Sequence, residues 1–382
     1  MKFLIAPDSF KGSLTANEVA ECIYQGLVKV FPTAEYQLVP MADGGEGTVQ
    51  SLIDATQGKK IYCQVHGPLK KTVDAYYGIL GDSQTAVIEM AQASGIQYVT
   101  DQTHNPLITT TYGTGELMLD ALNHHVKRII LGIGGSATND GGAGMAQALG
   151  ARLLTKDGRP VPLGGGNLNQ LDHLDISPID PRIAKTEILI ASDVTNPLTG
   201  KNGASAVFGP QKGATTAMIK RLDSNLHHYA AVIKHDLEKD IEMLPGAGAA
   251  GGLGAGLLAF TNSTMKKGIE LVIEYSGLAS KAAGAQFCFT GEEKIDFQTK
   301  FGKTPFGVAQ TVKKINPTAV VIGIAGGIGD NLSNLYNDQI FDAIFSSPSG
   351  AKNLQRAFAD SKHDIQQTAE NIARLIKTVK QH

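Results

Sequence analysis

The sequence has little cysteine and no long hydrophobic run. Its three cysteines, Cys22, Cys63 and Cys288, lie far apart and form no C-x-x-C pair. Such sparse thiols argue against a disulfide framework or a thiolate zinc site and suit a reducing compartment. The opening segment MKFLIAPDSF has too few apolar residues for a signal peptide, and the glycine- and alanine-rich stretch 245–260 is too short for a membrane span. We therefore expect a cytoplasmic protein that does not engage a membrane.

An excess of charge of one sign is also missing. The chain has 34 Lys and Arg against 36 Asp and Glu, a net charge of −2, and no segment concentrates basic residues. Nucleic acids and anionic membranes are bound by basic patches, so we expect neither as a partner. A small molecule is the better expectation.

Glycine, in contrast, is abundant. It accounts for 44 of the 382 residues, whereas an average protein has roughly 7%. The glycines cluster beside Asp, Ser, Thr and Asn, which indicates turns at which the backbone approaches something closely. The length of the chain exceeds what one hydrophobic core usually supports, so we expect two domains.

Both ends of the chain alternate between strand and helix patterns. Residues 2–6 form an apolar run, and the Thr15-x-x-Glu18 spacing after it is that of a helix capping box. Further strands are predicted at 287–290, 319–324 and 341–345. Strands separated by helices predict an α/β fold with a doubly wound parallel sheet. We expect this domain to comprise residues 1–60 and 270–382, with residues 61–269 inserted as a second α/β domain.

Polar, glycine-rich loops follow most of the predicted strands. Ligands bind at the edge of a parallel sheet where the carboxyl ends of the strands lie, so we expect these loops to converge on one cleft. The candidate binding residues in them are Asp8, Ser9, Lys11, Asp43, Glu46, Asp193, Asn196 and Glu292. Carboxylates in this setting can hold Mg²⁺ or accept the proton of an attacking hydroxyl, and a lysine such as Lys11 can neutralise charge on a transferred group.

The loop after the predicted strand 127–131 suits phosphate binding. Gly134, Gly135 and Ser136 precede a helix, where glycine lets phosphate oxygens approach and backbone N–H groups favour anions. Further candidates for ligand binding are Asn139, Asp140 and Lys212.

Plainer interpretations of several residues stay open. Asp140 suits a helix cap, Asp193 suits a turn, and Lys212 suits a surface position. The histidine pairs at 124–125 and 227–228 have no carboxylate or cysteine at ligand spacing, which is typical of solvated helix positions.

Two familiar nucleotide motifs carry no information here. Segment 132–137 fits a loose dinucleotide fingerprint, and 246–251 fits the strict one without a preceding strand, as a glycine-rich chain does by chance. The Gly-Lys-Thr at 302–304 resembles the end of a P-loop, but Phe297 stands where its first glycine is required.

Six longer segments resemble the signature motifs of bacterial glycerate kinases. They are APDSFKGSL at 6–14, MADGGEGT at 41–48, GIGGSATNDGG at 132–142, SDVTNPL at 192–198, VFGPQKGA at 207–214 and PGAGAAGGLG at 245–254. The stretch TGEEKID at 290–296 is close to a further motif, in which Glu293 takes the place of a glycine.

The sequence is thus similar to the type I glycerate kinase family over nearly its whole length. The resemblance implies ATP-dependent phosphorylation of glycerate, with ATP as co-substrate, Mg²⁺ expected, and 2-phosphoglycerate favoured over 3-phosphoglycerate as the product. It also implies a flavodoxin-like domain and a second α/β domain, with the active site in the cleft between them.

The resemblance supplies the substrates, whereas the roles of individual residues are our own hypotheses. Asp193 would orient or deprotonate the attacking hydroxyl, Lys11 would bind the glycerate carboxylate, and Gly134 to Ser136 would hold ATP phosphates with Mg²⁺. The metal ligands, the stereochemical preference and the oligomeric state stay open. The alternative is a non-catalytic two-domain sensor of a small organic anion, which would gain nothing from carboxylates that repel its ligand. A nicotinamide dehydrogenase would rest on the chance fingerprints alone.

Overall fold

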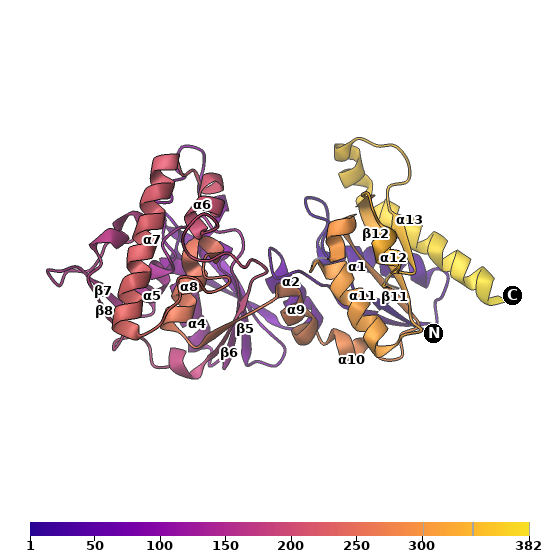
Figure 1. The fold of residues 1–382 in the computed structure, drawn as a ribbon. Coiled ribbons are helices and arrows are strands. Elements are labelled where there is room, and N and C mark those ends of the chain that lie inside the picture. Colours follow the sequence, from indigo (N-terminus) through magenta and orange to yellow (C-terminus); the bar gives the residue numbers. More distant parts are fainter. Residues whose placement is uncertain (301, 338–339, 382) are drawn as a thin grey trace. The chain divides into compact units, whose positions relative to one another are not determined.

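The computed structural model describes residues 1–300, 302–337 and 340–381, and its chain divides into two compact units (Figure 1). Unit 1 comprises Met1–Gly58 and Gly268–His382, and unit 2 comprises Lys59–Lys267. Each unit is built around its own large β-sheet. In Figure 1, unit 1 combines the indigo start of the chain with its orange-to-yellow end.

The sheet of unit 1 is parallel throughout. Its strands, in spatial order, are β2 (Glu35–Leu38), β1 (Lys2–Ile5), β11 (Phe287–Ile295), β12 (Val320–Ile328) and β13 (Ala343–Ser346). Numbered within the unit, this order is 2-1-3-4-5, the order of flavodoxin-like folds. The predicted parallel α/β domain of flavodoxin type is therefore confirmed.

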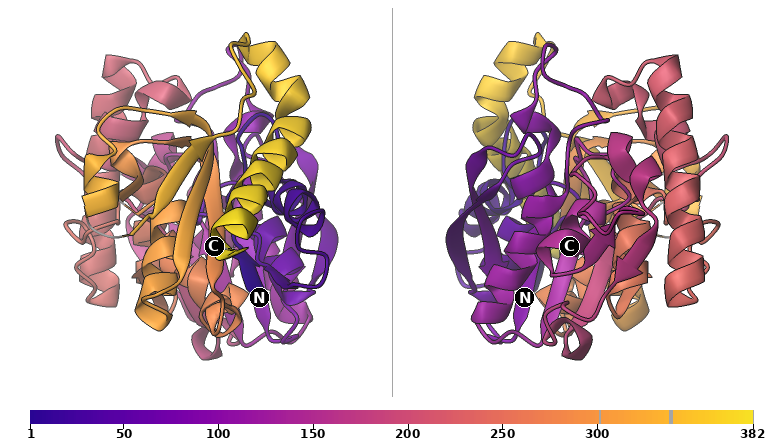
Figure 2. Two further views of the ribbon diagram at one scale, coloured as in Figure 1. Left: turned by 90° about the vertical axis from the view of Figure 1, so that its right-hand side faces the viewer. Right: turned by 90° about the vertical axis from the view of Figure 1, so that its left-hand side faces the viewer.

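Two long helices cover one face of this sheet. The helices of unit 1 are α1 (Ala16–Val28), α2 (Thr48–Thr56), α9 (Gly268–Ser276), α10 (Leu278–Ala282), α11 (Thr304–Ile315), α12 (Ser333–Asn337) and α13 (Leu354–Gln381). The helices α1 and α13 pack on each other and on Phe3 and Ile5, whereas α11 lies on the other side of the sheet (Figure 2). A Cβ at Gly26 of α1 would lie 2.4 Å from the carbonyl oxygen of Gln366, so glycine permits this close contact between helices.

Unit 2 contains a mixed sheet rather than a purely parallel one. Its strands, in spatial order, are β10 (Ser263–Lys266), β9 (Glu187–Ala191), β6 (Arg128–Gly132), β5 (Thr85–Glu89), β4 (Thr72–Ile79) and β3 (Lys59–His66). The first four of these are parallel to one another, and β4 and β3 add an antiparallel hairpin. A separate hairpin joins β7 (Arg152–Leu154) and β8 (His173–Asp175).

The helices of unit 2 include one that depends on glycine. They are α3 (Ala91–Ser94), α4 (Tyr112–Asn123), α5 (Ala143–Ala148), α6 (Ala204–Phe208), α7 (Thr216–Leu237) and α8 (Ala249–Phe260). At the start of α8, Gly251 has a φ of +69°, and a Cβ there would lie 1.9 Å from the carbonyl oxygen of Thr138. The fingerprint-like segment 246–251 therefore serves to let α8 pack against the loop that follows β6. Within the described residues, no helix has the length and apolar character that crossing a membrane would need.

Candidate active site

Two acidic residues meet at the centre of the sheet edge in unit 1. The strand order reverses between β1 and β11, and the carboxyl ends of strands at such a switch point form the usual ligand crevice of this fold. Asp8 follows β1, and its backbone N–H donates to the carbonyl oxygen of Gly291 at 2.8 Å. Glu292 comes next along β11. The expectation that Glu292 follows the end of its strand is wrong, because β11 continues to Ile295.

Asp8 is an enclosed carboxylate with both oxygens bonded. Its side chain is buried, with 8% of the residue exposed. Oδ1 accepts from the Ser9 N–H at 2.6 Å, and Oδ2 accepts from the Thr304 hydroxyl at 2.5 Å. Burial raises the pKa of Asp8 to about 6; the Thr304 hydrogen bond opposes this rise and the nearby charge of Asp43 adds to it.

The pKa of Glu292 is raised as well. The Thr299 hydroxyl donates to its Oε1 at 2.9 Å, and Lys303 Nζ lies 3.5 Å from the same oxygen. Burial raises the pKa of Glu292 to about 7, against the opposing effects of Lys303 and Thr299. Burial thus raises the pKa values of two neighbouring acids toward neutrality, and acids with such shifted pKa values are enriched at functional sites.

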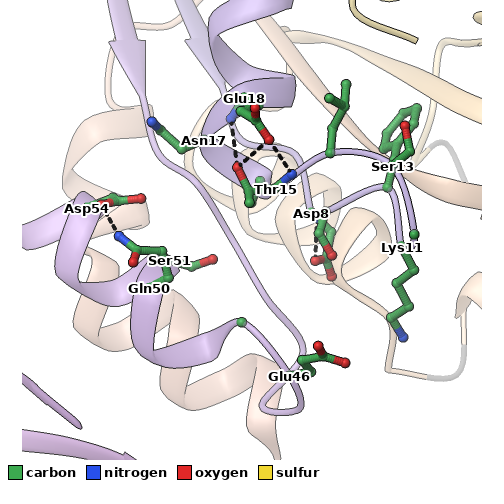
Figure 3. Close-up of a pocket in the computed structure, with 16 residues that line it drawn as sticks. Asp8, Lys11, Ser13, Thr15, Asn17, Glu18, Glu46, Gln50, Ser51 and Asp54 are labelled. Atoms are coloured by element: carbon green, nitrogen blue, oxygen red, sulfur yellow. Dashed lines mark hydrogen bonds between the residues drawn. The ribbon is translucent and has the colours of Figure 1, made fainter. Parts of the chain in front are cut away.

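The remaining predicted residues of unit 1 gather around this pair. One small cavity is lined by Asp8, Ser9, Lys11, Asp43, Glu292, Glu293 and Lys303. A larger cavity of about 360 Å³ is lined by residues 8–18 together with Glu46, Gly47, Gln50, Ser51 and Asp54 (Figure 3). The six candidates expected from this part of the chain thus lie together at one edge of the sheet.

Sequence reasoning missed several residues of this site. Lys303 and Thr304 had a signal, the Gly-Lys-Thr at 302–304, but it was interpreted only as a failed P-loop. Instead, Lys303 forms an ion pair with Glu292, and the Thr304 hydroxyl donates a hydrogen bond to Asp8. Gln50 and Asp54 of α2 also face the larger cavity, joined by a hydrogen bond of 2.6 Å (Figure 3).

The candidate residues of unit 2 lie at the corresponding edge of its sheet. The strands β6 and β9 are parallel neighbours, with Gly132 opposite Ala191. The loop with Gly134, Gly135 and Ser136 and the loop with Asp193 and Asn196 therefore leave the sheet on the same side. Gly134, Gly135 and Asp193 are exposed there.

Behind this edge lie polar residues that solvent does not reach. Lys212 is not a surface lysine, because only 1% of it is exposed. Asn139 donates from Nδ2 to the Ser205 hydroxyl at 2.9 Å. Asp140 accepts from the backbone N–H of Thr111 at 2.8 Å and of Gly144 at 3.3 Å. Asp140 therefore stabilises the beginnings of α4 and α5, although burial raises the pKa of its carboxyl.

The histidine pairs lie in or beside helices: His124 follows α4, and His227 and His228 lie in α7. His227 has a carboxylate partner that is distant in the sequence, since its Nδ1 lies 2.6 Å from Glu242 Oε1. That pair raises the pKa of His227. In the part of the chain that the structure describes, no cluster of three or more His, Cys, Asp or Glu is arranged to hold a metal ion.

A flavodoxin-like sheet with buried acids at its switch point, and a second sheet with an exposed glycine loop after a strand, are features typical of α/β enzymes, which bind ligands at the carboxyl ends of their strands. The model of the glycerate kinase family matches residues 3–377. The chain therefore belongs to the glycerate kinase family and is an enzyme of the phosphotransferase class.

Individual glycerate kinases are similar to this chain over nearly their whole length. A glycerate 2-kinase of Escherichia coli K12 is 51% identical over 373 residues, which cover 98% of this chain and 97% of the relative. A glycerate kinase of Halalkalibacterium halodurans is 51% identical over 370 residues, covering 97% of both chains. A crystal structure of a candidate glycerate kinase 2 from Salmonella typhimurium LT2 is 48% identical, covers 100% of both chains and has a TM-score of 0.92.

Proposed function

We propose that this protein transfers the γ-phosphoryl group of ATP to a hydroxyl of glycerate, with 2-phosphoglycerate as the favoured product. The observation that carries the proposal is the pair Asp8 and Glu292, two buried acids with pKa values of about 6 and 7 at the switch point. Family membership supplies the reaction class, and a relative named glycerate 2-kinase supports the position of transfer. The three cysteines are free, which favours a location in the reducing cytoplasm.

In the proposed reaction, the glycerate hydroxyl oxygen bonds to the γ-phosphorus while the bond to the leaving oxygen of ADP breaks. The hydroxyl proton passes to a carboxylate of the protein. Asp193 is the first candidate, because it is exposed at the same sheet edge as the Gly134 to Ser136 loop. Asp8 is a second candidate, because a pKa of about 6 leaves it mostly ionised yet basic at neutral pH.

Cations and backbone N–H groups would hold the two substrates. We propose that Lys11, exposed in the loop after β1, binds the glycerate carboxylate, and that Lys303 assists it. The exposed glycines at 134 and 135 would admit the ATP phosphates. We also propose that both sheet edges serve one active site, in a cleft between the two domains, since each edge supplies groups that the other lacks.

Magnesium would accompany ATP rather than occupy a ready-made protein cage. The described residues offer no cluster of three or more metal-ligating side chains, and Mg²⁺ commonly takes one or two carboxylates together with phosphates and water. When bound, the ion would neutralise charge on the phosphates. This chain has acidic groups at both edges for that contact, and we assign no single ligand.

A coupled assay of ADP release tests the proposal. ADP should appear only when glycerate, ATP and Mg²⁺ are all present, and phosphorus NMR of the product should show the 2-phosphate ester. Glycerate binding without ADP release would instead support the sensor of a small organic anion. A product carrying only the 3-phosphate would refute the proposed position of transfer.

A further inference from the structure

The glycine loop after β6 is held from two sides. On one side, the backbone of the segment around Ser94 is bonded to it: Ile96 N–H donates to the Gly135 carbonyl at 2.8 Å, and Ala137 N–H donates to the Ser94 carbonyl at 2.9 Å. On the other side, two buried side chains bond to it: the Thr109 hydroxyl donates to the Ala137 carbonyl at 2.9 Å, and Lys212 makes two further hydrogen bonds.

Lys212 reaches the loop from a short 3₁₀ turn, Pro210–Lys212, that follows α6. Its Nζ donates to the Ser136 hydroxyl at 2.7 Å and to the Thr138 carbonyl at 2.6 Å. With 1% of the residue exposed, a ligand outside the loop cannot touch the side chain. Any effect of Lys212 on a ligand must therefore pass through the loop.

This placement is costly for the fold. A buried ammonium loses its hydration, and well-packed apolar side chains often replace buried charges without loss of stability. Burial lowers the pKa of Lys212 to about 7, although Asp140 acts in the opposite direction. The loop bears a further cost, since Thr138 Oγ1 and Asn139 Oδ1 are buried without a hydrogen-bond partner among the described residues.

We propose that Lys212 is a positioning residue, which fixes the Gly134 to Ser136 loop in the conformation that binds the phosphates of ATP. The inference rests on the proposed function, because it takes ATP as the ligand of this loop. It assigns Lys212 no contact with ATP and no part in proton transfer. Its removal should therefore weaken nucleotide binding while leaving the affinity for glycerate nearly unchanged.

The test compares Lys212→Met with the wild-type full-length protein. Calorimetric titration with ATP and Mg²⁺, without glycerate, should show affinity reduced about 10-fold to 100-fold, because two hydrogen bonds from a charged donor are lost. The KM for glycerate should change by less than about threefold. Hydrogen exchange should accelerate at the amides of residues 134–138 and stay unchanged in β6 and β9.

Lys239→Met is the matched control in the same unit. Lys239 likewise makes two hydrogen bonds, in its case to the backbone carbonyls of Leu258 at 3.2 Å and Ala259 at 2.6 Å. Its replacement should lower the melting temperature without changing ATP affinity. If Lys212→Met does not fold, Ser136→Ala can replace it in the test. This variant removes the hydroxyl that accepts from Lys212 Nζ, and it should accelerate hydrogen exchange in the loop.

The outcomes separate this inference from the proposed function. If the wild-type protein binds ATP and the Lys212→Met protein binds it equally well, the positioning role is wrong and the kinase proposal stands. An equal loss of affinity for ATP and glycerate would likewise overturn it, because it would indicate general damage to the fold. If the wild-type protein fails to bind ATP, both proposals fail.

Discussion

Replacing Asp8 with asparagine should stabilise the protein at alkaline pH while it impairs catalysis. Burial raises the pKa of this carboxyl from 3.8 to about 6, so the folded protein disfavours the ionised form. Protonated Asp8 adds stability that is fully present below the unfolded-state pKa of 3.8 and is lost as the pH rises through about 6. Asparagine does not ionise, so the variant avoids that loss.

The size of the effect follows from the shift and the hydrogen bonds. A rise of about two pKa units corresponds to about 3 kcal/mol between the protonated and ionised forms. Asp8 accepts from Ser9 through one oxygen and from Thr304 through the other, whereas asparagine has one acceptor oxygen and loses about 1 kcal/mol. The variant should be about 2 kcal/mol more stable than wild type near pH 8 and about 0.5 kcal/mol less stable near pH 4, where ionisation of the unfolded state has already begun.

Urea unfolding of both proteins across this pH range, followed by circular dichroism in metal-free buffer, measures the difference. Asp157→Asn is a suitable control, because Asp157 is exposed in unit 2 and has an ion-pair partner only in Arg159 among the described residues. Its effect should vary little with pH. The reasoning is refuted if the stability difference between wild type and Asp8→Asn stays constant from pH 4 to pH 8.

Three further substitutions probe separate contacts. Thr304→Val removes the hydrogen bond that lowers the pKa of Asp8, so the acidic limb of the pH–rate profile should move to higher pH, and Thr304→Ser should restore it. Asp193→Asn should reduce kcat at least about 10-fold if this carboxylate accepts the proton; near wild-type turnover with an unchanged pH profile would exclude that role. Gly251→Ala should cost about 2 kcal/mol or more in thermal unfolding, because its Cβ would lie 1.9 Å from a backbone oxygen. Gly200→Ala, also at positive φ but with nothing within 4 Å, should cost less.

Most of the regular structure could be predicted, because apolar periodicity marks strands and helices directly. The apolar run 2–6 contains β1 (Lys2–Ile5), and the capping box of Thr15 and Glu18 is present. Of helix α7, only positions 227–228 were expected to be helical, although Leu222, Leu226 and Ile233 carry its buried face; the polar residues between them obscured that spacing.

Strand and helix ends were harder to predict than their cores. Gly291 seemed to end a strand, yet a Cβ there would lie 1.9 Å from the Ile324 carbonyl oxygen, so glycine permits close pairing within the sheet. In α13, Ile365 and Ile372 are buried, but Leu375, further along the same helix, is 59% exposed. Local sequence does not show where a neighbouring element stops covering a helix.

The loops of the candidate site could be predicted because they are local, but the state of their side chains could not. Lys212 in a Gly-Pro-Gln-Lys-Gly turn has every local mark of a surface residue. It is buried only because it bonds to Thr138, 74 positions earlier in the chain. Thr304 likewise bonds to Asp8 across 296 positions.

Because of these long-range contacts, ionisable side chains that suit a catalytic site lower the stability of the fold at the edges of the two sheets. Asp8 and Lys212 are each enclosed by distant segments, and burial moves the pKa of each toward neutrality, from 3.8 to about 6 and from 10.5 to about 7. Each shift means that the fold resists the charged form. Folding alone gives no reason for ionisable groups at these positions, whereas the proposed proton transfer and the proposed ordering of a phosphate loop would.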